Sequence, residues 1–214
     1  MTDLDFQRAR RPEQREARRR AILGVAAELL AEAPLAEISL RELARRVGLS
    51  KTNVVRYFET REAVFFALLN RSVEDWLAEL PAELPAGSPA AVAGALARSL
   101  AARPLVCELW SALGTQLERN ISADAVRDFK LANAANQARL AELLGVRVEG
   151  LEPAAAREFV ALLIVLVAGL WPFANPAPSV TEAIRDPRLA GSRVDFADRL
   201  ARSLQVVLTG LLSL

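Results

Sequence analysis

The stretch from Ser39 to Phe58 constrains the fold more than any other part of the sequence, because it predicts two short helices joined by a tight turn. Ser39 is followed three residues later by Glu42, a pair that caps a helix N-terminus reciprocally. Gly48 lacks a Cβ and suits the left-handed backbone that ends a helix, and Ser50 then supplies the next N-cap. Apolar residues recur at helical spacing on both segments, so each has an edge to bury. The pattern is typical of a helix-turn-helix.

The second of these helices has an outward face suited to the major groove of DNA. Arginine, lysine and asparagine match the edges of guanine and adenine, an apolar tip suits the methyl group of thymine, and cations contact phosphates. The alternative is that the face is only the solvated surface of a helical hairpin, since the same geometry occurs in proteins that do not bind DNA. We favour DNA binding because acids are sparse on this helix and arginines are dense upstream. The outward residues are Lys51, Thr52, Asn53, Val55, Arg56 and Tyr57.

The charge of the chain is small in total but unevenly distributed. Residues 1–71 hold 14 Arg or Lys against 10 Asp or Glu, a net of +4, and residues 72–214 hold 13 against 16, a net of −3. Such asymmetry is expected if only one end approaches a polyanion. Residues 1–12 lack apolar periodicity, so we expect a mobile, arginine-bearing arm with Pro12 opening the first helix. The arginines at 15, 18, 19 and 20 could form a solvated helix start, but we favour phosphate or minor-groove contact by the flexible arm.

Composition argues against several other classes of protein. The chain has no histidine, the commonest general base and metal ligand, and Cys107 is its single cysteine. We therefore expect no catalysis, no metal and no cofactor. A single cysteine cannot form a disulfide within the chain, which is consistent with a protein of the reducing cytoplasm. The N-terminus has no apolar signal-peptide core, and the longest apolar run, residues 159–174, has 16 residues, short of the roughly 18 to 20 that span a bilayer. We expect this run to be a helix buried on every side, with no membrane partner.

The rest of the chain has the periodicity of amphipathic helices, which predicts an all-α protein of about nine helices. The long helix that follows the helix-turn-helix should end before Pro81, the one that starts at Ser122 near Leu144, and residues 174–191 should form a loop. The last two helices are too apolar for one monomer, so we expect a homodimer with a four-helix interface. The predicted helix starts are Pro12, Ser39, Ser50, Thr60, Ser88, Pro104, Ser122, Glu152 and Ser192.

Two amides interrupt the apolar seam of the helix that starts at Ser122. Phe129, Asn133, Asn136 and Leu140 fall at helical spacing, so the amides face the interior. Buried amides need partners, and a hydrogen bond to a neighbouring helix is the first interpretation. The second is that they orient a ligand in an aromatic cavity. That ligand site would comprise Trp76, Cys107, Trp110, Phe129, Asn133, Asn136 and Trp171.

Two segments carry a resemblance to a known family: Leu-Ala-Arg-Arg-Val-Gly-Leu-Ser over residues 43–50 and Arg-Tyr-Phe-Glu-Thr-Arg-Glu-Ala-Val over residues 56–64. They resemble the tetracycline-repressor-like (TetR) family of bacterial transcriptional regulators. The resemblance implies an all-helical homodimer with a DNA-binding domain of three helices, which we place at residues 1–62. It implies a helical domain over residues 63–214 for dimerisation and often for an inducing ligand. By position, the DNA contacts it implies are Ser39, Arg41, Lys51, Thr52, Asn53, Val55, Arg56, Tyr57 and Arg61.

The chain departs from the family at Val55, where tyrosine is frequent, and at Arg61, where lysine is frequent. We expect a cytoplasmic, sequence-specific repressor, released from a double-stranded operator by a small hydrophobic ligand. Ligand would shift the helix that spans residues 65–80 and so change the separation of the two recognition helices, which half-site spacing fixes. The alternative is a constitutive dimeric DNA-binding protein of the same fold. A helical enzyme and a membrane-associated protein have less support.

Overall fold

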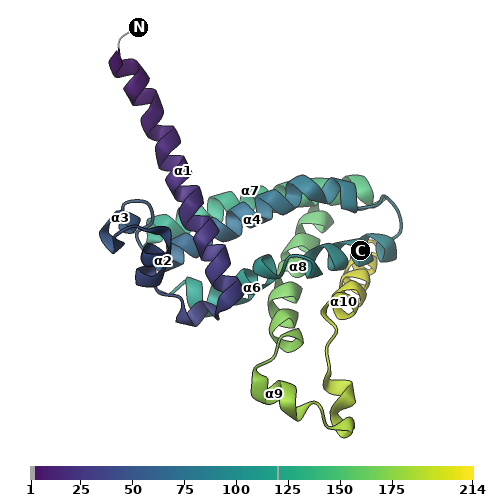
Figure 1. Cartoon of the computed structure of the whole chain (residues 1–214). Coiled ribbons are helices and arrows are strands. Elements are labelled where there is room, and N and C mark those ends of the chain that lie inside the picture. Colours follow the sequence, from purple (N-terminus) through teal and green to yellow (C-terminus); the bar gives the residue numbers. More distant parts are fainter. Residues whose placement is uncertain (1–2, 120) are drawn as a thin grey trace.

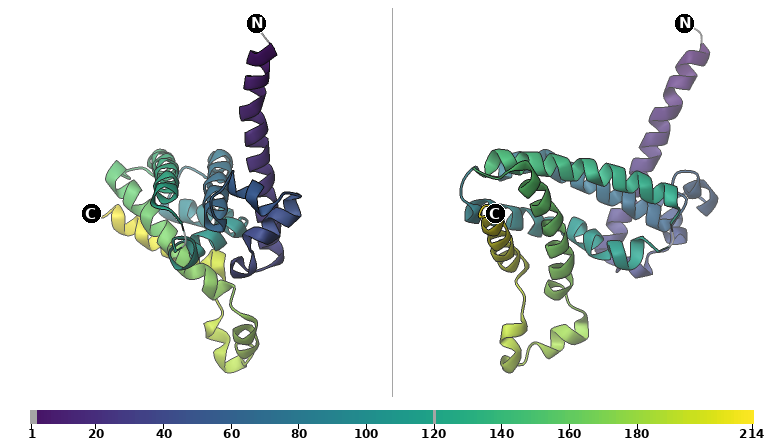
Figure 2. Two further views of the ribbon diagram at one scale, coloured as in Figure 1. Left: turned by 90° about the vertical axis from the view of Figure 1, so that its left-hand side faces the viewer. Right: turned by 180° about the vertical axis from the view of Figure 1, so that it is seen from behind.

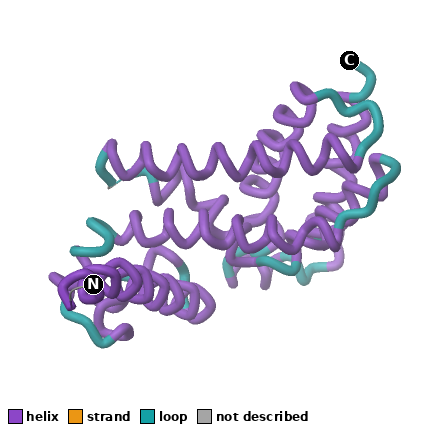
Figure 3. Tube along the Cα trace, turned by 90° about the horizontal axis from the view of Figure 1, so that it is seen from above, coloured by secondary structure: helices purple, strands orange, loops and turns teal. Residues whose placement is uncertain are grey.

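The computed structural model describes residues 3–119 and 121–214, and over these ranges the chain is helical with no strand (Figure 3). Ten α-helices and three short 3-10 or π segments are present there, close to the nine helices predicted, and the all-α class is confirmed. In chain order the elements are α1 (Asp3–Glu32), η1 (Leu35–Glu37), α2 (Leu40–Val47), α3 (Lys51–Val55), α4 (Arg61–Glu83), α5 (Pro89–Ala101), α6 (Pro104–Ala112), η2 (Leu113–Leu117), α7 (Ala123–Arg147), α8 (Pro153–Ala174), α9 (Pro178–Ala183), η3 (Pro187–Ser192) and α10 (Phe196–Leu211).

Helix α1 is longer than the sequence predicted. It begins at Asp3 with Pro12 inside it, so the expected mobile arm is wrong for residues 3–11, while residues 1 and 2 lie outside the described part. Proline removes one backbone hydrogen bond but keeps a helical φ, so it does not have to end the helix. The N-terminal half of α1 projects away from the rest of the molecule (Figures 1 and 2), and Ile22 is its first buried residue among those whose burial is described.

Helix α4 leaves the helix-turn-helix and runs beside α7 for most of its length (Figures 1 and 2). The Asn70 amide on α4 donates to the Phe129 carbonyl on α7, and the Asn136 amide on α7 donates to the Asn70 carbonyl, each over 3.4 Å. One turn before Asn70, the ring of Phe66 on α4 stacks on that of Phe129 on α7, with the ring centres 4.1 Å apart. The structural interpretation of Asn136 is therefore confirmed. Asn133 is half-buried and forms no side-chain hydrogen bond within the described part.

A second polar contact ties the first turn of α7 to the helix-turn-helix. The Glu59 carboxylate accepts the Ser122 backbone N–H over 3.0 Å. Hydrogen bonding from Ser122 lowers the pKa of the Glu59 carboxyl from its ordinary value. The α7 N-terminus thus contacts the same corner of the chain from which α4 starts.

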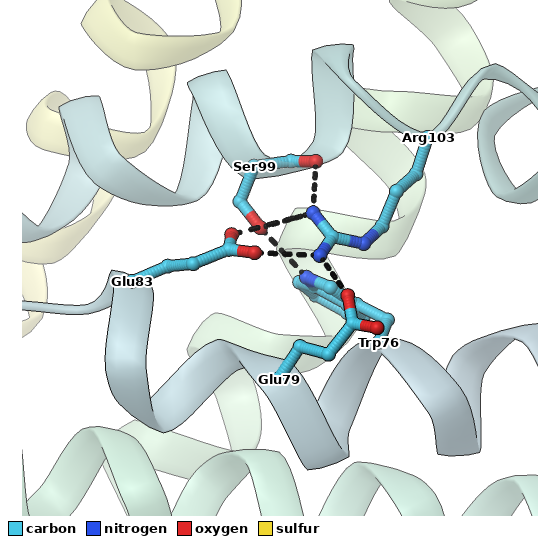
Figure 4. Close-up of polar contacts among 5 residues, drawn as sticks. All are labelled: Trp76, Glu79, Glu83, Ser99 and Arg103. Carbon is cyan, nitrogen blue, oxygen red and sulfur yellow. Dashed lines mark hydrogen bonds and ion pairs between the residues drawn. The ribbon is translucent and has the colours of Figure 1, made fainter.

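The far end of α4 is fixed by Arg103, at the corner between α5 and α6 (Figure 4). Its guanidinium donates to the carboxylates of Glu79 (2.7 Å) and Glu83 (2.6 Å) and to the Ser99 carbonyl (2.8 Å). The Ser99 hydroxyl also accepts the Trp76 indole N–H over 2.9 Å. The bond from Arg103 holds the pKa of the Glu83 carboxyl below its ordinary value. With only 18% of its side chain exposed, Arg103 satisfies several groups at once, which favours a net stabilising contribution.

The sequence predicts that the apolar run of α8 is buried on every side, and this prediction is wrong. Its most apolar 18-residue window has a mean hydropathy of 1.9, yet only 28% of that window is buried in the chain. Phe159, Leu163 and Val167 pack inward, whereas Val165 is 65% exposed and Phe173 is 70% exposed. The prediction failed because periodicity cannot identify what covers a helix that is apolar all round.

Residues 174–191 are not the plain loop that was expected. They contain the short segments α9 and η3, neither of which has a buried residue, and both stand away from the body (Figures 1 and 2). The chain then returns as α10, which packs on α5 and α8.

Four helix ends differ from the prediction. Helix α4 continues past Pro81 and α7 past Gly145, because a breaker near the last turn forfeits few hydrogen bonds. Helix α3 ends at Val55, so it is shorter than expected. The N-cap of α10 is Asp195, which accepts the Asp198 N–H over 2.9 Å, so the cap lies three residues after the predicted cap at Ser192.

We expect Arg103→Ala to lower the free energy of unfolding by about 1–3 kcal/mol, because it leaves the Ser99 carbonyl and the carboxylates of Glu79 and Glu83 without their donor. Urea unfolding followed by circular dichroism measures the change. The matched control is Arg127→Ala, whose ion pair with Asp124 is exposed, and it should change stability by less than about 0.5 kcal/mol. Equal effects for both variants would contradict the role given to Arg103.

Candidate nucleic-acid interface

The predicted serine caps and glycine turn of the helix-turn-helix are confirmed, but the reciprocal cap is wrong, because the Glu42 carboxylate accepts from Arg45 and not from the Ser39 N–H. The Ser39 hydroxyl accepts the Glu42 N–H over 3.1 Å, and the Ser50 hydroxyl accepts the Asn53 N–H over 3.2 Å. Gly48 takes a left-handed φ of 74° between them. Leu43 and other apolar residues of the motif are completely buried. The caps and core therefore fix the orientation of α3 before any ligand arrives.

Helix α3 presents the predicted outward face to solvent. Lys51, Thr52 and Asn53 are exposed, and Val55 keeps 42% of its surface accessible. Arg56 is exposed and Tyr57 half-buried, but both lie in the turn that follows α3 rather than on the helix. On α2, Ser39 and Arg41 are exposed at the N-terminal end.

Arg61 is the exception among the predicted DNA contacts, because its guanidinium points inward and binds other residues of the helix-turn-helix region. It donates to the carbonyls of Leu35 and Ile38 over 3.3 and 3.2 Å. It also forms a 2.9 Å ion pair with Glu62, which is 6% exposed. We therefore assign Arg61 to joining the η1 segment to α4 and leave it out of the proposed phosphate contacts.

Arg19 positions the turn after α3, a role that the sequence did not reveal. From α1 its guanidinium donates to the Tyr57 carbonyl over 2.7 Å and lies 4.3 Å above the centre of the Phe58 ring. It thereby holds the turn after α3 against α1. In the sequence it is one of several arginines in a row, and only its helical spacing from the apolar stripe distinguishes it.

A basic hollow of about 430 Å³ lies between α1 and the turn after α3. Its lining is Gln14, Arg15, Arg18, Arg56 and Tyr57. Among the side chains described, those of residues 12–119 and 121–214, no carboxylate lies within 4.0 Å of any of these three arginines. Their positive charge is uncompensated, which is the electrostatic condition for binding an anion.

The arginines at the end of α2 differ, because the chain already neutralises them. Arg45 forms a 2.5 Å ion pair with Glu42, and Arg46 pairs with Glu32 on α1. The hydrogen bond from Arg45 lowers the pKa of the Glu42 carboxyl. The free cations of this domain therefore gather around α3 and α1 rather than at the end of α2.

The residues predicted for a ligand site do not surround one cavity. Trp76 and Trp110 pack edge to face with ring centres 6.0 Å apart, and burial raises the pKa of the Cys107 thiol to about 12. Phe129 lines a groove beside the helix-turn-helix, whereas Trp171 lines a separate groove beside α1. A single aromatic pocket built from these residues is not what the structure contains.

The geometry is that of a helix-turn-helix DNA-binding domain joined to a larger helical domain. The family model described as "Bacterial regulatory proteins, tetR family" matches residues 22–68. A second model, "Tetracyclin repressor-like, C-terminal domain", matches residues 70–213. The chain belongs to the TetR family of transcriptional regulators, and members of this family are DNA-binding regulators rather than enzymes.

Similar proteins agree with this assignment. The chain is 35% identical to the HTH-type transcriptional regulator RutR of Escherichia coli over 66 residues, which are 31% of each protein. It is 43% identical to EthR of Mycobacterium tuberculosis over 68 residues, 29% of this chain and 32% of that protein. The match thus spans about a third of the length of these curated relatives, at 31% and 32%.

Solved structures support the fold across nearly the whole chain. A TetR transcriptional regulator from Rhodococcus sp. RHA1 superposes with a TM-score of 0.62 at 20% identity, over 92% of this chain and 97% of that one. A second transcriptional regulator from the same organism gives 0.55 at 24% identity, over 93% and 96%.

Alanine variants of Arg61 and Arg56, on opposite sides of the α3–α4 turn, should distinguish an arginine that stabilises the fold from one that only adds charge to the surface. We expect Arg61→Ala to lower the unfolding free energy by about 1–3 kcal/mol, because two backbone carbonyls and Glu62 lose their donor. Arg56→Ala, its control, should change it by less than about 0.5 kcal/mol. Thermal and urea unfolding measure both, and an unchanged Arg61 variant would contradict the inward role.

Proposed function

We propose that this protein is a cytoplasmic, homodimeric repressor that binds a double-stranded DNA operator through α3 and is released from it by a small hydrophobic ligand. One observation supports DNA binding above all. The basic hollow next to the exposed face of α3 is lined by Arg15, Arg18 and Arg56, whose positive charge is not neutralised by an ion pair. A phosphate placed there would hold the duplex while neighbouring side chains meet base edges.

The roles at this interface follow from side-chain chemistry. Lys51 and Asn53 suit guanine and adenine edges, and Val55 offers an apolar tip for a thymine methyl group. Thr52 and Ser39 are short polar groups suited to phosphate or base contacts, and the Arg41 and Tyr57 side chains suit phosphate. Fixed caps and the Arg19 bond to the Tyr57 carbonyl pre-orient this surface, which reduces the entropy lost on binding.

The dimer proposal rests on the outer face of α8 and α10. These helices contact one another within the chain, and Val165, Phe173 and Val206 remain 65%, 70% and 66% exposed. An apolar face of this kind on adjacent helices favours a second copy related by two-fold symmetry, which buries the same side chains from both subunits.

A membrane is the alternative occupant of that face, since α8 is long and apolar enough to cross one. One side of α8 is already occupied by contacts to α6, α7 and α10, and Phe159 and Leu163 are completely buried there. A helix packed along one side by three neighbouring helices suits an interface between proteins better than a lipid-surrounded span. We therefore propose a second copy of the chain and no membrane partner.

Release by ligand is proposed because α4 connects the DNA-binding domain directly to the helical domain. The rival is a constitutive dimeric DNA-binding protein of the same fold. Thermal-shift and calorimetric screening with apolar small molecules distinguishes the two, and a compound that stabilises the protein while weakening DNA binding supports release.

We expect Asn53→Ala and Arg56→Ala to weaken DNA binding in different ways. Asn53→Ala should relax preference at one base pair by about 1–3 kcal/mol, because an amide reads a base edge. Arg56→Ala should weaken binding to all sequences and reduce the slope of log K against log salt by about 1. Fluorescence anisotropy with selected operator and scrambled duplexes measures both.

The control for these variants is Arg139→Ala, an exposed arginine on α7 remote from α3 in the sequence. It should match the wild type in affinity and salt slope. If Asn53→Ala and Arg56→Ala also match the wild type on a selected operator, α3 does not read DNA as proposed.

We expect Val165→Glu to convert the dimer into monomers at micromolar concentration, because each subunit would bury a carboxylate in the interface. Sedimentation velocity measures the change. Val146→Glu on α7, where the valine is 79% exposed, is the matched control and should sediment as the wild type. A dimeric Val165 variant would show that α8 does not form the interface.

A further inference from the structure

A groove of about 550 Å³ lies where α1 meets α6 and the end of α8. One wall is the last turns of α1 and the loop that follows, with Leu30, Ala31 and Leu35, and the other is α6 and α8, with Leu105 and Trp171. Its size falls within the range of small-molecule sites, and most of its lining is apolar. The residue Trp171, predicted from the sequence for a ligand site, is therefore placed at this groove.

One carboxylate in this lining has no cation beside it. Glu108 on α6 is half-buried, and its Oε2 accepts the Trp171 indole N–H over 2.9 Å. The other acid of the groove, Glu32, is already paired with Arg46. No Lys or Arg lines the groove, and within the described ranges none lies within 4.0 Å of the Glu108 carboxylate. An unpaired carboxylate beside apolar walls attracts a cation, because the low-dielectric surroundings strengthen the interaction.

We propose that this groove is a binding site for a small organic ammonium ion with an apolar, preferably aromatic, body. The body would pack on Trp171 and on the aliphatic side chains of α1, and the ammonium group would donate to Glu108. The Trp171 N–H fixes the orientation of the carboxylate before the cation arrives. The ring of Trp171 is itself held edge to face by Phe196, with ring centres 5.0 Å apart.

The position of the groove gives such a cation a means to act on DNA binding. Its two walls belong to the DNA-binding domain and to the helical domain, so an occupant contacts both. A ligand shifts an equilibrium only by its difference in affinity for the two arrangements, and a ligand lodged between two domains has that difference if their separation changes. The effect of the cation on DNA binding rests on the proposed function, whereas the binding of the cation does not. It adds to that function the chemical class of the inducer.

The test is calorimetric titration of the intact protein with 2-phenylethylammonium, and with neutral 2-phenylethanol and anionic 3-phenylpropanoate as probes of similar shape. We expect the ammonium probe to bind about tenfold more tightly than the alcohol, as one charge-assisted hydrogen bond allows, and the carboxylate probe to bind least. Glu108→Gln keeps an acceptor for Trp171 but removes the charge, so it should abolish the preference. Ala31→Trp at an exposed groove position should remove binding of all three probes.

The matched controls are Glu74→Gln and Ala78→Trp, exposed positions on α4 that do not line the groove, and both should behave as the wild type. Failure of the ammonium probe to bind at millimolar concentration overturns the site, as does a preference that survives Glu108→Gln. So does binding that survives Ala31→Trp.

A second readout isolates the coupling. The ammonium probe should weaken operator binding, and operator should weaken probe binding by the same factor. Probe binding without any change in DNA affinity overturns the coupling and leaves the site. If the wild type binds no DNA at all, the proposed function fails, while the titrations with the three probes still decide the site.

Discussion

Two hydrogen bonds from side-chain amides to backbone carbonyls, between α4 and α7, are the constraint on which the rest of the arrangement depends. Each of two asparagines donates across the interface to a backbone carbonyl, so neither helix can slide along the other without leaving a buried polar group unsatisfied. Helix α4 starts at the turn that follows α3, and the Glu59 bond to the α7 N-terminus fixes the same corner. The orientation of α3 is thus set by contacts with α4 and α7, and not only by its own small core.

This coupling restricts which movements can alter DNA binding. The Arg103 cluster fixes the far end of α4 to the corner between α5 and α6, so a shift of α4 alone would break contacts at both ends. Movement of α4 and α7 together costs less, because the amide bonds and the stacked rings travel with them. The groove between α1, α6 and α8 lies outside that pair of helices.

Local chemistry made most of the DNA-binding domain predictable from the sequence. Serine caps, a glycine turn and apolar spacing each act within a few residues, and all of them are found in the structure. Contacts made across the chain were not predictable. Arg61 and Arg19 looked like surface cations, and only the fold shows the backbone carbonyls that they bind. The aromatic residues were assigned to one cavity because the spacing of apolar residues indicates which side chains are buried, but not where in the core each one lies.

The excursion between α8 and α10 has a consequence of its own. Because α9 and η3 bury no side chain, their unfolding exposes almost no new apolar surface, so they can open without cooperative loss of the core. Amide protons there should exchange far faster than those of α8, and proteases should cut this excursion first. A single cut would leave α8 and α10 packed together, as two chains within one intact fold.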